Sequence, residues 1–211
     1  MSANKSDPPK HFSMIRDFHV ADILTLANAS CGISAVFACM AYLETHQMTC
    51  FYLAVALGPL ALVFDALDGR VARWRHEHSL LGRELDSLAD VISFGVGPAS
   101  VAYVAGLRGG WDLVILTFFV ACGVSRLARY NVTADTLAAG SDKVKYFEGA
   151  PIPTSLLLTA VLTILAWTGH LGEDIWPGAV DIGPFRLHFA ALLFAAHGAV
   201  MVSKTIRIPK P

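Results

Sequence analysis

The sequence predicts an all-α integral membrane protein with six transmembrane helices and a short N-terminal interfacial helix. Two observations carry this prediction. The chain of 211 residues is 55% hydrophobic and only 16% charged, and it contains six apolar runs separated by polar or basic segments. A mean hydropathy of +0.53 fits one membrane domain better than a soluble one. The net charge of −1 gives no indication of a nucleic-acid partner.

The N-terminal region, residues 1–20, is expected to be a polar leader that ends in the interfacial helix. Within residues 11–20, Phe12, Ile15 and Phe18 recur near helical spacing, which favours a helix lying on the membrane surface. The region lacks the apolar stretch of a secretory signal peptide. We therefore divide the chain into this leader, a six-helix membrane catalytic domain over residues 21–204, and a C-terminal tail over residues 205–211.

The six apolar runs are the predicted transmembrane helices. Some are shorter than the roughly 20 residues that a helix needs to cross a membrane, so we expect the second, third and fourth helices to extend through their polar ends. The runs cover about 21–43, 49–68, 87–106, 111–125, 152–170 and 187–203.

Basic residues predict the orientation of these helices. Only Arg108 and Arg186 fall in the alternate connections, whereas the other fourteen of the sixteen Lys and Arg residues lie at the termini or in the connections after the second and fourth runs. By the positive-inside rule, both termini and residues 65–90 are cytoplasmic. An even number of spans follows.

Four carboxylates border the second and third apolar runs. Asp65 and Asp68 share one face of a helix, and Asp86 and Asp90 share a face of the next, because their spacings are i, i+3 and i, i+4. One such acid alone is usually a helix cap or part of a solvated surface, but a set beside membrane-length runs indicates function. Carboxylates without nitrogen or sulfur ligands suit Mg²⁺, Mn²⁺ or Ca²⁺. The sequence therefore predicts a site for two divalent metals.

The neighbours of these acids indicate a phosphate-bearing substrate. Arginine offers a planar fork of donors to phosphate, and small residues on the same helix faces leave room for an extended ligand. The arginines are Arg70, Arg73 and Arg83, and the small residues are Gly69, Ala72 and Gly82.

The spacing of this segment is specific. It reads Asp65-x-x-Asp68-Gly69-x-x-Ala72-Arg73, then eight residues, then Gly82-x-x-x-Asp86-x-x-x-Asp90. At every fixed position this resembles the signature of the CDP-alcohol phosphotransferases, membrane enzymes that make phospholipids.

Two later stretches narrow the resemblance. Ser125–Asn131 reads SRLARYN, and 146–153 reads YFEGAPIP. Together with residues 87–99 and the ending MVSKTIRIPKP, they are similar to the phosphatidylserine synthase branch of that family. Ala150 stands where the branch usually has Leu, and the C-terminal segment carries an additional Lys204. The resemblance covers nearly the whole chain from residue 20 onward.

The resemblance implies a reaction in which CDP-diacylglycerol and L-serine give phosphatidylserine and CMP. It implies that Asp65, Asp68 and Asp86 bind Mg²⁺ or Mn²⁺, while Asp90 completes the second metal site and acts as general base on the serine hydroxyl. The residues expected to bind the nucleotide are Asn28, Asp68, Gly69, Ala72, Arg73 and Gly82.

Three further expectations concern residues outside the signature. Helix capping explains Asp22 and Thr25 at the start of the first run, whereas Asn28 lies one turn deeper.

Arg126 and Arg129, at i, i+3 on one helix face, and Lys145 are candidates for the serine carboxylate or the lipid phosphate. The alternative for the two arginines is anchoring at the membrane surface. The four cysteines lack metal-ligand spacing and are expected to be small core residues.

Several alternatives remain open at this level. The acceptor could be choline, glycerol 3-phosphate or inositol phosphate, because the signature reads only the CDP half of the substrate. Intramembrane acids also occur in cation or proton transporters, and a non-catalytic lipid-binding protein is a third class. The resemblance implies a homodimer among membrane lipids. Small size and the lack of targeting signals suit a bacterial inner membrane, with the active site at its cytoplasmic face.

Overall fold

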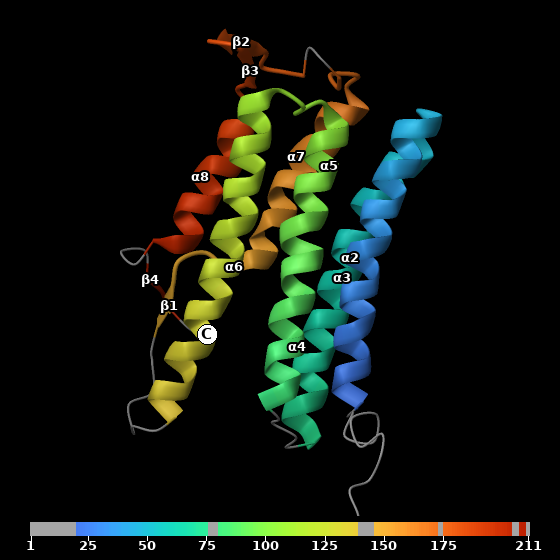
Figure 1. Cartoon of the computed structure of the whole chain (residues 1–211). Coiled ribbons are helices and arrows are strands. Elements are labelled where there is room, and N and C mark those ends of the chain that lie inside the picture. Colours follow the sequence, from blue (N-terminus) through green and yellow to red (C-terminus); the bar gives the residue numbers. More distant parts are fainter. Residues whose placement is uncertain (1–19, 76–79, 139–145, 173–174, 204–206, 210–211) are drawn as a thin grey trace, which may run out of the picture.

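A computed structural model of the chain describes residues 20–75, 80–138, 146–172, 175–203 and 207–209. These residues form a bundle of long helices with two short β-ribbons (Figure 1). The predominantly helical architecture is therefore confirmed. The predicted interfacial helix over residues 11–20 lies outside the described residues, apart from Val20.

The described helices and strands form a fold with one hydrophobic core. The helices are α2 (Val20–Thr45), α3 (Met48–Arg75), α4 (Leu80–Asp90), the π-helix η1 (Val91–Val96), α5 (Gly97–Ala105), α6 (Gly110–Ala138), the 3₁₀-helix η2 (Ile152–Ser155), α7 (Leu156–Trp167) and α8 (Ala191–Val202). The strands are β1 (Tyr146–Glu148), β2 (Ala179–Ile182), β3 (Phe185–His188) and β4 (Arg207–Pro209).

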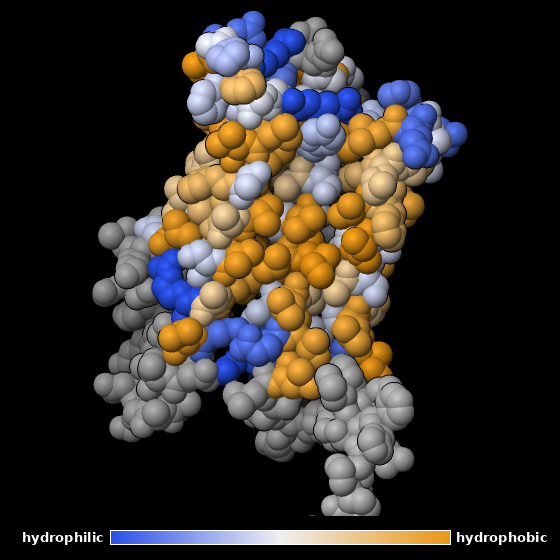
Figure 2. Space-filling view, viewed as in Figure 1, coloured by the Kyte–Doolittle hydropathy of each residue, from blue (hydrophilic) through white to orange (hydrophobic). Residues whose placement is uncertain are grey.

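Four helical segments are long and apolar enough to cross a membrane. They match the first four predicted runs and are Val20–Thr45, Met48–Trp74, Leu81–Ala105 and Gly110–Val132. The fifth and sixth runs correspond to the shorter apolar helices Ile152–Trp167 and Ala191–Val202. The sixth run was predicted too long, because Leu187 and His188 belong to strand β3. Figure 2 shows a wide hydrophobic band across the middle of the bundle, as a membrane protein requires.

Small side chains allow the helices to approach closely. Helices α2 and α3 pack as an antiparallel pair, and Ala35, Ala38, Ala54 and Ala61 on them are buried. Between transmembrane helices, where lipid is as apolar as the protein interior, close backbone approach is a main source of association. Larger side chains fill the other half of the bundle, where Phe119 of α6 meets Phe194 of α8 edge to face at 5.3 Å between ring centroids.

The two ends of the bundle differ. Strands β2 and β3 form an antiparallel hairpin at one end, at the top of Figure 1. The end of α3 and the start of α4 lie at the opposite end. In that lower half, β1 pairs antiparallel with β4, so that Tyr146 faces Pro209 in the register. Neither ribbon was predicted from the sequence.

The hairpin is fixed to the start of α6 by a buried pair. Asp112 Oδ2 lies 2.5 Å from His188 Nδ1, and the same carboxylate accepts the backbone N–H groups of His188 and Gly109, at 2.8 and 2.7 Å. Asp112 thus caps the helix and anchors β3 at once. This pair lies at the end of the bundle away from the four-aspartate segment.

Candidate active site

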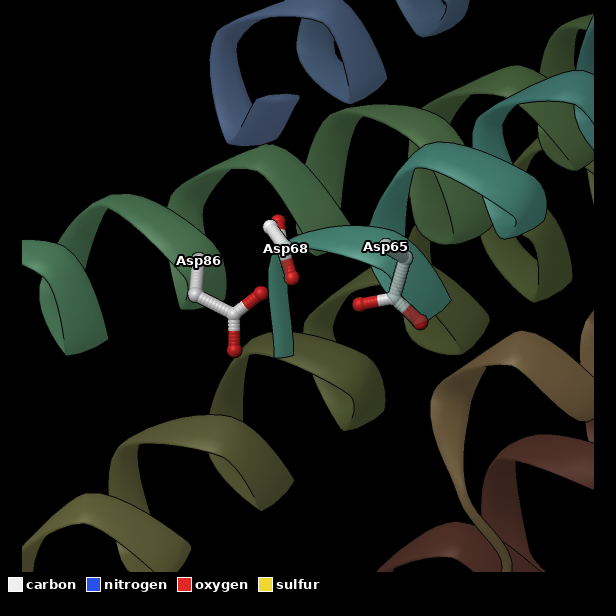
Figure 3. A group of neighbouring side chains, drawn as sticks. All are labelled: Asp65, Asp68 and Asp86. Carbon is white, nitrogen blue, oxygen red and sulfur yellow. The ribbon is translucent and has the colours of Figure 1, made fainter. Parts of the chain in front are cut away.

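Three of the four predicted acids converge. Helix α3 supplies Asp65 and Asp68, and α4 supplies Asp86 (Figure 3). One carboxylate oxygen from each lies within 4.8 Å of the others. The helical spacing contributes to the convergence, because Asp65 and Asp68 lie one turn apart on one face of α3, and Asp86 of α4 lies close to both.

Asp90 lies one turn beyond Asp86, at the end of α4, and is only 8% exposed. Its Oδ1 accepts a hydrogen bond of 3.3 Å from Asn28 Nδ2 on α2. Its charge also interacts with Asp65 and Asp86. The fourth acid thus belongs to the same electrostatic cluster, and its hydrogen bond comes from Asn28 of α2.

Helix α2 supports the cluster at a second point. Thr25 Oγ1 donates to Asp68 Oδ2 at 2.7 Å and also lies 3.1 Å from the carbonyl oxygen of Ala21. The capping interpretation of Thr25 is therefore wrong, because α2 begins at Val20 and Thr25 lies inside it. Periodicity shows which face of a helix a residue occupies, and the contact with Asp68 depends on how α2 packs against α3.

The predicted nucleotide residues lie on the same helices. Gly69, Ala72 and Arg73 follow Asp68 on α3, and Gly82 lies on α4. A Cβ atom added at Gly69 would meet only the guanidinium of Arg73, at 3.4 Å. The backbone at Gly69 is thus covered by one flexible side chain, as expected if a ligand displaces it. Arg73 and Arg70 are exposed.

The structure gives the two arginines of α6 different partners. Arg126 is half-buried and its charge interacts with that of Asp90. Its Nε is buried and has no hydrogen-bond partner among the described residues. Arg129 instead donates from Nη1 and Nη2 to the carbonyl oxygen of Val202, both at 3.3 Å, at the end of α8. Lys145, the third candidate, lies outside the described residues.

A polar link between α4 and α6 was not predicted. Asn131 Nδ2 donates to Ser87 Oγ at 3.0 Å and lies 3.3 Å from both carboxylate oxygens of Glu84. Asn131 is 8% exposed. The signal was present in the sequence, since Asn131 closes the SRLARYN stretch and Ser87 follows Asp86. The link keeps α6, with Arg126, beside the acidic helix.

A polar hollow lies below the hydrophobic band. Figure 2 shows hydrophilic residues around a hollowed area between the lower half of α6 and α4. The donor set consists of carboxylate oxygens, which hard divalent cations prefer. Oδ1 of Asp86 is buried and has no hydrogen-bond partner among the described residues, so this oxygen lacks the partner that a buried carboxylate needs. These features fit a divalent metal.

The cysteines occupy buried or half-buried positions. Cys31, Cys39 and Cys122 are buried, Cys50 is half-buried, and all four are free thiols. The prediction that they are small core residues is confirmed for the three that are buried.

The sequence matches known proteins along most of its length. Residues 18–201 match the sequence model of the CDP-alcohol phosphatidyltransferase family. The CDP-diacylglycerol–serine O-phosphatidyltransferase of Saccharomyces cerevisiae is 42% identical over 212 aligned positions, which cover 95% of this chain and 74% of the yeast protein. The protein of that name from Helicobacter pylori is 36% identical, with 89% of this chain and 70% of the relative covered. The Mycobacterium tuberculosis protein is 40% identical over 58% of this chain and 43% of its own length.

Proposed function

The chain belongs to the CDP-alcohol phosphatidyltransferase family, and on this basis we propose that it transfers the phosphatidyl group from CDP-diacylglycerol to the hydroxyl of L-serine. The products are phosphatidylserine and CMP. The carrying observation is that Asp65, Asp68 and Asp86 place carboxylate oxygens within 4.8 Å of one another at the polar end of a membrane bundle.

Asp65, Asp68 and Asp86, with Asp90 completing a second site, would hold Mg²⁺ or Mn²⁺. When bound, such cations neutralise charge on the pyrophosphate and on the departing CMP. The support is the oxygen donor set and the buried, unpartnered Oδ1 of Asp86. Thr25 orients one of these ligands through its hydrogen bond to Asp68.

Asp90 is the proposed general base. The serine hydroxyl oxygen attacks the phosphorus that bears the diacylglycerol group, its proton passes to the Asp90 carboxylate, and the bond from that phosphorus to the CMP oxygen breaks. Asn28 holds one oxygen of Asp90 by a hydrogen bond. The other oxygen is left to receive the proton.

The two substrates need different contacts beside the cluster. Asn28, Gly69, Ala72, Arg73 and Gly82 are the proposed nucleotide contacts beside Asp68. Serine must be recognised by its charged groups, since an alcohol alone does not distinguish it from other acceptors.

Arg126 is the favoured contact for the serine carboxylate. Its buried Nε has no protein partner among the described residues, and its charge interacts with that of Asp90. Arg129 and Lys145 remain candidates for the carboxylate or the lipid phosphate, although Arg129 already contacts Val202.

The proposed membrane arrangement has six spans. The short helices α7 and α8 would complete the bundle, both termini would be cytoplasmic, and the acids would face the cytoplasm. The support is the position of fourteen of sixteen basic residues. A bacterial inner membrane and a homodimer are part of the proposal.

The test is CMP release by the purified protein given CDP-diacylglycerol and Mg²⁺ or Mn²⁺. L-serine, choline, glycerol 3-phosphate and inositol phosphate are supplied separately, and EDTA is added in a parallel set. Serine-dependent release that EDTA abolishes is the expected result. CMP release driven by another alcohol would support the transfer reaction but contradict serine as the acceptor. Binding of lipid and metal without release would favour a transporter or a lipid-binding protein.

A matched control separates the site from general effects of losing an acid. Asp181 is exposed on strand β2, at the opposite end of the bundle. Asp181→Asn should release CMP at the rate of the unmodified protein, whereas Asp86→Asn should not. Equal rates in the two variants would contradict the proposed site.

A further inference from the structure

The helix that carries Asp86 and Asp90 changes its winding directly after Asp90. Residues Val91–Val96 form a π-helix, in which the N–H of Gly97 donates to the carbonyl of Ile92, five residues earlier. Short π-helical segments inside α-helices widen the backbone and often lie at functional sites. The widened segment begins one residue after Asp90.

Pro98 gives a physical reason for this segment. In an α-helix, the carbonyl of Phe94 would accept the N–H of residue 98, but proline has no N–H, and its ring collides with the carbonyl four residues earlier. The π-helix lies directly before Pro98, where a proline disturbs a helix. The carbonyl of Phe94 therefore loses its α-helical donor.

Ser155 supplies a donor to that carbonyl. Its Oγ donates to the oxygen of Phe94 at 2.7 Å, and the Ser155 side chain is fully buried, with 0% exposed. Ser155 is the last residue of η2, whose first two residues are the last two of the YFEGAPIP stretch. Ile152 of the same segment packs beside Gly95 and Gly123. This loop therefore seats against the π-helix.

Helix α2 also contacts the π-helix. Ser93 Oγ donates to the carbonyl of Asn28 at 2.8 Å. A Cβ at Gly32, one turn along α2, would lie 2.6 Å from Ser93 Oγ and 2.8 Å from Ser93 Cα, so this contact leaves no space for adjustment. Asn28 in turn holds the Asp90 carboxylate. The π-helix is thus held by both α2 and η2, and Asp90 projects from its start.

We propose that Ser155 is a positioning residue for Asp90: by donating to the Phe94 carbonyl that Pro98 deprives of its α-helical donor, it fixes the π-helix and thereby the direction of the Asp90 carboxylate. The inference rests on the proposed function, in which Asp90 takes the proton of the acceptor hydroxyl. It adds that η2, the segment directly before α7, affects the position of one of the four acids. Ser155 itself touches neither substrate.

The test compares three variants with the unmodified enzyme in detergent or lipid. Ser155→Ala removes the donor with almost no change of shape. Ser155→Cys keeps the volume with a weak donor. Thr159→Val is the matched control, because Thr159 is a buried hydroxyl of α7 whose bond goes to Leu156 of the preceding turn. For each variant kcat, KM for CDP-diacylglycerol and the thermal midpoint of unfolding are measured.

Ser155→Ala should lower kcat about tenfold, since small displacements of a reacting group cost rate steeply. KM for CDP-diacylglycerol should stay within twofold, because the nucleotide contacts lie on α2, α3 and α4. Ser155→Cys should fall between Ser155→Ala and the unmodified enzyme, and Thr159→Val should leave kcat unchanged.

Two results would overturn the inference. One is a kcat of Ser155→Ala equal to that of the unmodified enzyme. The other is a loss that Thr159→Val shares in proportion to its own fall in the unfolding midpoint. If Ser155→Ala does not fold, the same comparison between Ser155→Cys and Thr159→Val decides. Asp90→Asn is assayed beside them: retained turnover there would remove the proposed role of Asp90, whereas an inactive Asp90→Asn beside a fully active Ser155→Ala would remove the positioning role alone.

Discussion

Thr25 donates a hydrogen bond of 2.7 Å to Asp68 across 43 positions of sequence. The bond joins the first described helix to one of the proposed metal ligands. A hydroxyl on one oxygen of a carboxylate fixes the direction of the other oxygen. The geometry of the cluster therefore depends on α2 as well as on the two helices that carry the acids.

Thr25→Val should raise the Mg²⁺ or Mn²⁺ concentration needed for half-maximal activity by about tenfold, the usual effect of losing a group that orients a ligand. Valine keeps the shape of threonine and removes the donor. The measurement is a metal titration of CMP release. Thr25→Ser, which keeps the hydroxyl, serves as control and should stay close to the unmodified enzyme. An unchanged titration in Thr25→Val would show that the bond does not orient the ligand.

Asp90→Asn should lower turnover by at least about 100-fold, because the amide cannot accept the proton and a general base contributes 10²–10⁴ in rate. Binding of CDP-diacylglycerol should persist, since asparagine keeps the size of aspartate. Turnover is followed by CMP release and binding by direct titration of the lipid. Loss of binding with unchanged residual turnover would contradict the base role.

Arg126→Ala and Arg129→Ala should separate a substrate contact from a helix contact. Arg126→Ala should raise the serine concentration for half-maximal rate at least about tenfold, as expected for a lost charge-assisted contact. Arg129→Ala should instead lower the free energy of unfolding by about 1–2 kcal/mol, because the last turn of α8 loses a charged donor at Val202. Serine kinetics and thermal unfolding of both variants check this. Unchanged serine dependence in Arg126→Ala would refute the assignment.

Asp112→Ala should destabilise the protein without slowing the folded enzyme. The change leaves the N–H groups of Gly109 and His188 without their acceptor, and it removes the partner of the His188 ring. The expected loss is about 3 kcal/mol in the free energy of unfolding. Unfolding in denaturant and kcat at low temperature provide the measurement. A fall in kcat without loss of stability would show that the hairpin end takes part in the reaction.

The sequence predicted what helical periodicity determines. The spacing of Asp65 and Asp68 places both on one face of a helix, and Asp86 lies on the next helix. All three lie where an apolar run ends or begins, so the two helices carry their acids at the same depth in the membrane. Four long apolar helices were likewise predictable from the lengths of the runs. In lipid, a segment must pair its own backbone N–H and C=O groups, and a helix does so.

Contacts between distant segments were not predictable in the same way. The partners of Thr25, Asn131 and Ser155 depend on helix rotation and on packing, which spacing does not determine. Both β-ribbons are three or four residues long, and strands this short carry too little alternation to recognise. The sequence shows Pro98, but the residue that donates to the Phe94 carbonyl, Ser155, lies 57 residues later in the chain.

The pairing of β1 with β4 bears on the biosynthesis of the protein. Residues 146–148 obtain their strand partner only when residues 207–209 have left the ribosome. The acidic helices are by then already synthesised, whereas the loop that leads to Ser155 still lacks one side of its ribbon. A nascent chain that stops short of residue 207 therefore has all four aspartates but lacks one strand of this ribbon, so activity is expected only after residues 207–209 have been added.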